Sequence, residues 1–140
     1  MLDSSANRCF VCGPGNNIGL KVRFQLDDEN ICHAEWTSSA EYVGYEGVTH
    51  GGIIFCLLDD VMANLLFLRG EICVTAKADV RFHEPLGLDE KIKLRGNLVK
   101  RRGKLAIIEG SAVRDSDDAL IASSTAHFVV QPVTEIANRS

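Results

Sequence analysis

The chain lacks the features that mark a membrane or a secreted protein. Its longest uninterrupted apolar run, Ile53 to Leu58, is far short of the ~20 residues that span a bilayer. Residues 1–5, MLDSS, carry neither the basic nor the apolar segment of a signal peptide. We therefore expect no membrane partner and a cytoplasmic location.

The chain also lacks an excess of positive charge and an even number of cysteines. The formal net charge is -4, so nothing in the composition favours a nucleic-acid partner. Five cysteines are an odd number, which fits reduced thiols better than a disulfide framework. Cys9 and Cys12 have the spacing of metal ligands, but one such pair is only half of a zinc site and no second pair follows. The sequence predicts a structured turn there and no metal.

The length of 140 residues suffices for one hydrophobic core, so we expect a single domain over residues 1–140. Residues 1–18 are expected to be irregular and residues 131–140 to form a loose polar tail. Alternating apolar and polar residues predict strands over 20–26, 32–37, 72–83, from 92 to a basic turn at 101–104, over 105–114 and over 120–130.

A helix is predicted between the second and third of these strands, over about Gly51–Leu68. From Ile53 onward nearly every residue in it is apolar, which is typical of a buried helix. Two adjacent acids, Asp59 and Asp60, interrupt the apolar run. A buried carboxylate needs a partner or a function, and helical spacing places Asp60 on one face with Asn64.

The residues His50-Gly51-Gly52 stand at the predicted start of that helix. Backbone N–H groups without intrahelical partners and the positive end of the helix dipole lie there. One helix thus offers a candidate oxyanion site at its start and a candidate base in its middle.

Two strands, one helix and four more strands predict an α+β fold. Short connections favour antiparallel pairing, and a sheet with one apolar face must cover that face. We expect an antiparallel sheet of about five to six strands to wrap around one long central helix. The far side of the helix would stay exposed unless a second subunit covered it.

Several motifs at these positions resemble the hot-dog fold acyl-CoA thioesterases of the PaaI-like and THEM4-like branch. The resemblance covers residues 9–130 and includes an aspartate nine residues after the histidine of His-Gly-Gly. The matching segments are Cys9-Phe10-Val11-Cys12-Gly13, Gly19-Leu20, Gly44 to Gly52, Leu58-Asp59-Asp60, Val74-Thr75-Ala76 and Phe82-His83-Glu84-Pro85.

The resemblance implies roles for four residues. Asp59 would be the catalytic base or nucleophile, and the N–H of Gly51 would bind the thioester oxygen. Thr75 would hold the attacking water or the acid, although strict alternation places it on the opposite strand face from Val74. Reaching the site therefore requires a bulge, or a dimer interface on that face. His50 would orient groups by hydrogen bonding rather than transfer protons.

One departure from the family concerns Gly44. Many PaaI-type members carry an asparagine at this position, six residues before the histidine. Its loss leaves polarisation of the carbonyl to Gly51, with help from His50.

Candidate contacts for substrate lie in three places. Gly52 follows the oxyanion residue, and Arg81 and His83 lie at the end of a predicted strand. The basic turn is either a solvated hairpin tip or a contact for the phosphates of coenzyme A. Its candidate residues are Lys100, Arg101 and Arg102. No cofactor is expected beyond the coenzyme A of the substrate.

The spacing of the implied catalytic groups predicts a homodimer, which could pair into a tetramer as in relatives. Gly51 and Asp59 are separated by about 12 Å along a helix, too far for both to act on one carbonyl. Two antiparallel helices related by a two-fold axis would bring Gly51 of one chain beside Asp59 of the other. The alternatives are a hot-dog hydratase or dehydratase on acyl thioesters, and a non-catalytic acyl-CoA-binding protein.

Overall fold

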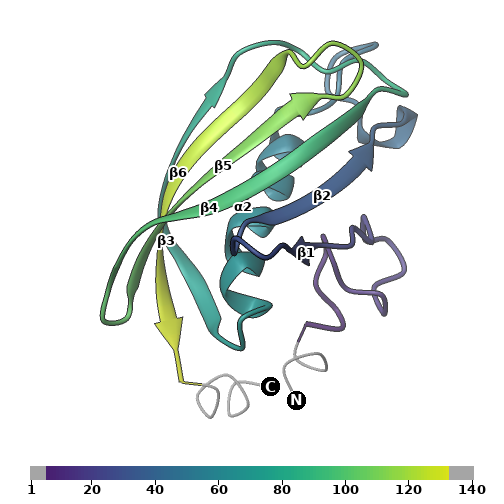
Figure 1. Ribbon diagram of the computed structural model, residues 1–140. Helices are drawn as coiled ribbons and strands as arrows, with labels where there is room; N and C mark the ends of the chain where they lie inside the picture. The colour runs from purple at the N-terminus through teal and green to yellow at the C-terminus, as the bar shows by residue number, and fades with distance from the viewer. Residues whose placement is uncertain (1–5, 133–140) are drawn as a thin grey trace.

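Six antiparallel strands wrap around one α-helix in the computed structural model, which describes residues 6–132. The strands form a single sheet in the order β1-β2-β4-β5-β6-β3 (Figure 1). This arrangement confirms the predicted fold class. The elements are β1 (Gln25–Leu26), β2 (Cys32–Thr37), the 3-10 helix η1 (Ala40–Tyr42), α2 (Gly51–Phe67), β3 (Ile72–Phe82), β4 (Lys91–Arg102), β5 (Leu105–Arg114) and β6 (Leu120–Gln131).

The first strand is much shorter than predicted. Only Gln25 and Leu26 pair with β2, and Lys21 has a positive φ of 55°. The backbone N–H groups of Leu20 and Val22 instead donate to carbonyls of the N-terminal segment, at 2.8 and 2.9 Å. Leu20 and Val22 are buried as expected, but they pack beneath residues 6–19 rather than in a strand. Most of the predicted tail, residues 133–140, and residues 1–5 lie outside the described residues.

Helix α2 is held close to the sheet. A Cβ on Gly96 would lie 2.7 Å from the Val61 carbonyl oxygen, and one on Gly110 would lie 2.9 Å from Cγ of Met62. These two glycines are register partners on β4 and β5, so together they make room for the helix. The helix side chains buried in the core are Ile54, Leu57, Leu58, Val61, Met62, Leu65 and Leu66.

Strand β3 forms one edge of the sheet and contains a bulge. Its register with β6 shifts between Thr75 and Lys77. Before the bulge Cys73 faces the helix, and after it Ala78 packs against the core. The single alternation predicted for this strand was therefore wrong, because the extra residue reverses which positions face inward.

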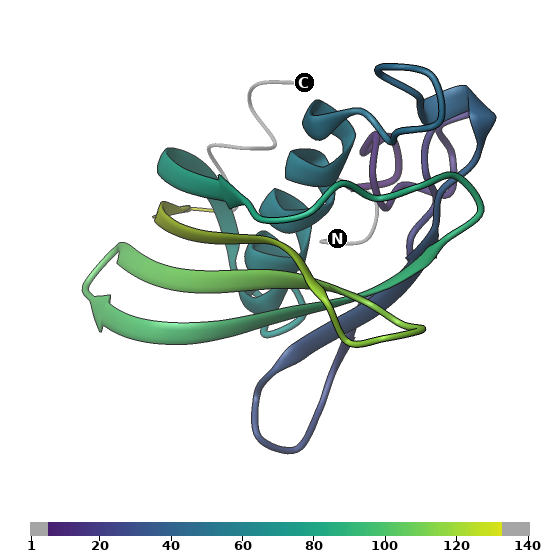
Figure 2. The same cartoon turned by 90° about the horizontal axis from the view of Figure 1, so that it is seen from above.

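The two long sides of α2 have different neighbours (Figures 1 and 2). The N-terminal segment lies on the β1 side of the helix, and β3 lies on the other side. Within residues 6–132, no strand pairs with the outer edge of β3. None of the described helices is long and apolar enough to cross a membrane.

Candidate active site

His50 caps the start of α2. Its backbone is extended, and its Nδ1 accepts a hydrogen bond from the Gly52 N–H at 2.8 Å. In the neutral ring this bond places the proton on Nε2. A Cβ on Gly52 would lie 3.0 Å from Nδ1, so the glycine leaves room for the cap. The structure thus gives His50 a capping contact, and Gly52 leaves room for the ring. The catalytic role of His50 and the substrate contact of Gly52 stay predictions.

The N–H of Gly51 is left as the free donor at this helix start. Ile53 and Ile54 both donate to the His50 carbonyl, at 3.1 and 3.3 Å, and Gly52 donates to the ring. Among the described residues, no acceptor is found for Gly51. Gly51 borders a cavity of about 350 Å³, together with Ile54, Phe82 and other residues. A free amide at the positive end of a helix, on a residue that borders a cavity, can bind a developing oxyanion.

Gly44 packs against the same histidine. A Cβ at this position would lie 3.2 Å from Cα of His50 and 3.4 Å from its Cδ2. A larger residue would have to push the two segments apart. The glycine that stands in place of the family's asparagine therefore allows this loop to lie close to His50.

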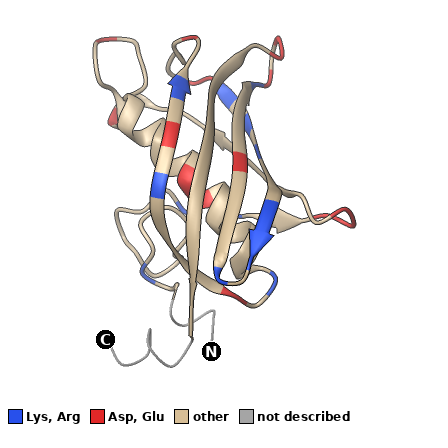
Figure 3. Ribbon diagram, turned by 90° about the vertical axis from the view of Figure 1, so that its left-hand side faces the viewer, with Lys and Arg blue, Asp and Glu red and all other residues tan. Residues whose placement is uncertain are grey.

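Asp59 lies on the side of α2 that faces β3, because Thr75 of that strand contacts it. The acidic residues in the middle of α2 are red in Figure 3. Its Oδ1 accepts a hydrogen bond from the Thr75 hydroxyl at 2.7 Å. Burial raises the pKa of the Asp59 carboxyl, and the hydroxyl partly opposes that rise. Oδ2 has no hydrogen-bond partner within residues 6–132, so it can accept a proton from water. The bulge in β3 is what lets Thr75 reach this carboxylate.

Asp60 points to the opposite side of the helix. Its Oδ2 accepts a hydrogen bond from Asn64 Nδ2 at 2.9 Å, and the Sγ of Cys9 lies 3.7 Å from its Oδ1. Burial raises the pKa of Asp60 to about 7. The contact with Asn64 confirms the prediction made from helical spacing. The contact with Cys9 was missed, because no sequence pattern links residues 51 positions apart.

Some of the candidate substrate contacts are already bonded to other side chains of the protein, and others are exposed. Arg101 forms a two-bond ion pair with Glu71, at 2.9 and 2.8 Å, and is therefore not a free phosphate contact as the sequence suggested. Lys100 and Arg102 are exposed at the hairpin beside it. At the end of β3, Arg81 is exposed, and His83 Nε2 lies 3.0 Å from Ser123 Oγ.

Comparison with known proteins identifies the family. Residues 46–121, more than half of the chain, match the thioesterase superfamily. The chain belongs to this superfamily. It is 30% identical over 115 residues to MIOREX complex component 3 of Saccharomyces cerevisiae, a match that covers 76% of this chain and 42% of that protein. The chain thus spans less than half the length of the curated relative.

Solved structures of thioesterase-like proteins have the same fold. Protein RHA08564, a thioesterase superfamily protein, superposes with a TM-score of 0.77 at 28% identity, over 85% of this chain and 61% of that chain. The E. coli PaaI protein superposes with a TM-score of 0.74 at 16% identity, over 81% of both chains. A hypothetical thioesterase of Streptococcus pneumoniae superposes with a TM-score of 0.73 at 15% identity, over 79% of this chain and 85% of that chain. These neighbours confirm the hot-dog fold, and the family match confirms the resemblance to thioesterases.

Proposed function

We propose that the protein is an acyl-CoA thioesterase, which hydrolyses an acyl-CoA to a free acid and coenzyme A. Membership of the thioesterase superfamily supports hydrolysis of a thioester in general. The proposal that the substrate is an acyl-CoA thioester hydrolysed at this site rests on one observation: α2 provides both a free amide and an oriented carboxylate. A free Gly51 amide stands at the helix start, and Asp59, oriented by Thr75, stands in the middle.

The proposed site is completed by a second subunit. Gly51 and Asp59 are about 12 Å apart along α2, so one chain cannot present both to the same carbonyl. The open edge of β3 offers a way to join two copies, because its outer backbone groups can pair with another strand. Thr75 and Phe82 are exposed along this edge. Pairing that lays the two α2 helices antiparallel yields two equal sites per homodimer, and such dimers can pair again.

In each site the thioester carbonyl accepts a hydrogen bond from the Gly51 N–H. Asp59 of the partner subunit either removes a proton from water, which attacks the carbonyl, or attacks it directly to give an anhydride that water then hydrolyses. The C–S bond breaks, and the thiolate of coenzyme A leaves and is protonated. A preorganised donor contributes ~2.7–4 kcal/mol and a positioned base ~10²–10⁴-fold.

The neighbours support coenzyme A as the carrier. The Streptococcus pneumoniae protein was solved with coenzyme A, and a Streptococcus mutans protein was solved bound to acetyl CoA. In the pneumococcal protein, an aspartate and a threonine were each replaced by alanine, and they lie sixteen positions apart, as Asp59 and Thr75 do. Lys100, Arg102 and Arg81 are the exposed cations that we assign to the phosphates. We propose no cofactor beyond the coenzyme A of the substrate.

Release of free thiol from a panel of acyl-CoAs tests the proposal. The panel runs from acetyl to palmitoyl and includes phenylacetyl and hydroxybenzoyl, and we expect turnover of at least one member. Binding of the whole panel without thiol release would instead show an acyl-CoA-binding protein. Interconversion of enoyl and 3-hydroxyacyl thioesters without free thiol would show a hydratase.

Two substitutions at one position test the role of the amide. Gly51→Pro deletes the N–H at the first helical position, where proline is tolerated, and the extended backbone of His50 suits a following proline. Gly51→Ala keeps the N–H, and its Cβ would meet only the Phe82 ring, at 3.6 Å. We expect ~10²–10³-fold lower kcat for the proline variant and a much smaller change for the alanine variant. Equal losses in both variants would refute the role of the amide.

A further inference from the structure

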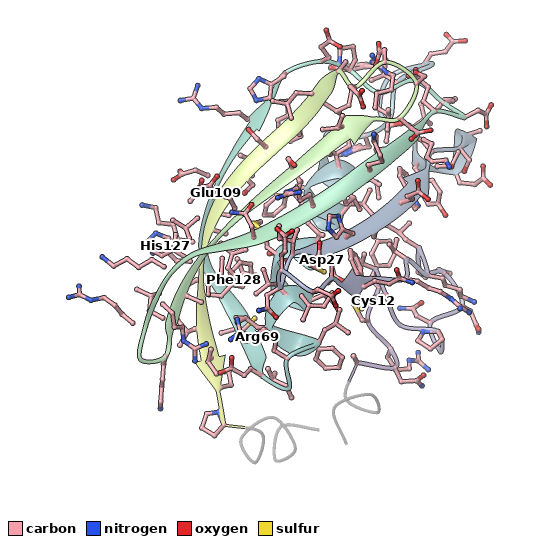
Figure 4. The ribbon with its side chains drawn as sticks, in the orientation of Figure 1. Cys12, Asp27, Arg69, Glu109, His127 and Phe128 are labelled. Carbon is pink, nitrogen blue, oxygen red and sulfur yellow. The ribbon has the colours of Figure 1, made fainter. Side chains whose placement is uncertain are left out.

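A cluster of two thiols and one carboxylate lies where the N-terminal segment packs against α2. One ligand atom each from Cys9, Cys12 and Asp60 lies within 4.8 Å of the other two. Cys9 and Cys12 come from the N-terminal segment, and Asp60 comes from the middle of the helix; Figure 4 shows Cys12 on the segment beside α2. The fold thus adds a third donor to a pair of cysteines that had only two by spacing.

The charge balance of this cluster is incomplete. Asp60 is partly buried, and its neighbours are the Cys9 thiol and the amide of Asn64. In the described part of the chain, no lysine, arginine or histidine forms an ion pair with it. Asp59 adds a second acid next to it in the sequence. A carboxylate in such surroundings is costly unless a cation joins it.

There is also room for an ion beside the three donors. A cavity of about 120 Å³ is bordered by Cys9, Cys12, Asp60 and Asn64, together with Cys73 from β3. A water molecule occupies about 30 Å³ of liquid volume, so the cavity can hold an ion with a bound water. The remaining wall of the cavity is apolar and is made by Ala6, Ala63, Phe67 and Ile72.

We propose that this cluster binds one Zn²⁺ through Cys9 Sγ, Cys12 Sγ and one Asp60 oxygen, with water in the fourth position. Two thiolates and a carboxylate suit zinc, and the Cys9 Sγ to Asp60 Oδ1 distance of 3.7 Å is close to the ~3.5 Å edge of a tetrahedral site. On binding, the two thiols release their protons to solvent. This proposal departs from the expectation of no metal, because Asp60 supplies the third donor that cysteine spacing does not show.

The metal would fasten the N-terminal segment to α2. Residues 6–19 cover Leu20 and Val22, so fixing them to the helix closes one end of the core. Among the described residues, no hydrogen bond joins the three donors to Asp59 or Thr75, and the site takes no part in the proposed hydrolysis. The inference is therefore independent of the proposed function.

Zinc content and zinc binding of the full chain test this inference. Protein purified under reducing conditions without chelator is expected to carry one zinc per chain by elemental analysis. After removal of the metal by a chelator, added Zn²⁺ should restore that ratio and raise the Tm. Cobalt(II) in place of zinc should give the intense near-ultraviolet absorption of thiolate ligands.

Matched variants locate the ligands. We expect Cys9→Ser, Cys12→Ala and Asp60→Asn each to weaken Zn²⁺ binding at least tenfold, in line with loss of a ligand. Cys73→Ala borders the same cavity but lies outside the cluster, and it should bind zinc as the wild type does. The cobalt spectrum uses the wild-type chain, so it decides the question even if a variant does not fold.

Three results would overturn the site. One is reduced, metal-free wild-type protein that fails to bind zinc in equilibrium dialysis or to show thiolate absorption with cobalt. Another is unchanged zinc affinity in all three ligand variants. The third is a thiol count two short of five in the freshly isolated, denatured protein, with no zinc binding after reduction, which would identify a Cys9–Cys12 disulfide instead.

Discussion

The two sides of α2 carry the same carboxyl group in opposite surroundings. Asp59 faces β3, the open edge of the sheet, where Thr75 holds one oxygen and the other is free. Asp60 faces the N-terminal segment, where Asn64 and Cys9 contact it. Adjacent residues of identical chemistry are thus held in different surroundings by what packs against each side. The open side suits a reaction, and the covered side suits a fixed structural contact.

Replacement of the acid on the open side should have the largest effect. Asp59→Asn removes the proton acceptor but keeps the size of the side chain. We expect kcat for thioester hydrolysis to fall ~10²-fold or more, with KM changed little, because the carboxylate acts mainly on the transition state. The Tm should hold or rise, since a partly buried charge is lost. Steady-state kinetics on the best acyl-CoA give the answer, and kcat near that of the wild type would contradict the assignment.

Loss of the hydroxyl that orients this acid should have a smaller effect. Thr75→Val keeps the shape and removes the hydrogen bond to Asp59, so we expect kcat to fall about tenfold, equivalent to ~1.4 kcal/mol of one hydrogen bond to a charged group. Thr125→Val on β6 is the matched control, because Thr125 is exposed and does not border the site. Equal kcat for the two variants would mean that Thr75 does not position Asp59.

Replacement of the acid on the covered side should change activity least. Asp60→Asn keeps the contact with Asn64 possible and lies away from the free oxygen of Asp59, so we expect kcat within a few-fold of the wild type. Its effect should appear in Tm and zinc content. A collapse of kcat in Asp60→Asn beside a normal Asp59→Asn would show that the two sides had been assigned the wrong way round.

The sequence predicted most of the fold but only part of these surroundings. Period-two alternation located β2, β4, β5 and β6, and the apolar run from Ile53 located α2 to within a residue of its end. The strand predicted over 20–26 was too long, because Leu20 and Val22 alternate as a strand does but bond to the N-terminal segment. The sequence indicated a bulge only as one of two ways for Thr75 to reach the site, because nothing in Val74-Thr75-Ala76 marks an extra residue.

Two contacts between distant segments, those of Cys9 and Arg101, could not be predicted from the sequence. The approach of Cys9 to Asp60 and the pairing of Arg101 with Glu71 depend on how elements pack in three dimensions. Spacing along the chain carries no information on such pairs. Asp59 itself was chosen over Asp60 by resemblance to a family, and helical periodicity alone did not distinguish them.

The central claim is that Gly51 of one subunit and Asp59 of the other form each site. A heterodimer tests it most directly: one chain carries Gly51→Pro, the other carries Asp59→Asn, and two different affinity tags isolate the mixed species. If the sites are shared, one site combines two substituted residues and the other is intact. The heterodimer should then recover about half of the wild-type kcat per dimer, far above either parent homodimer. A heterodimer as inactive as both parents would show that donor and base act from the same chain, and would contradict the account.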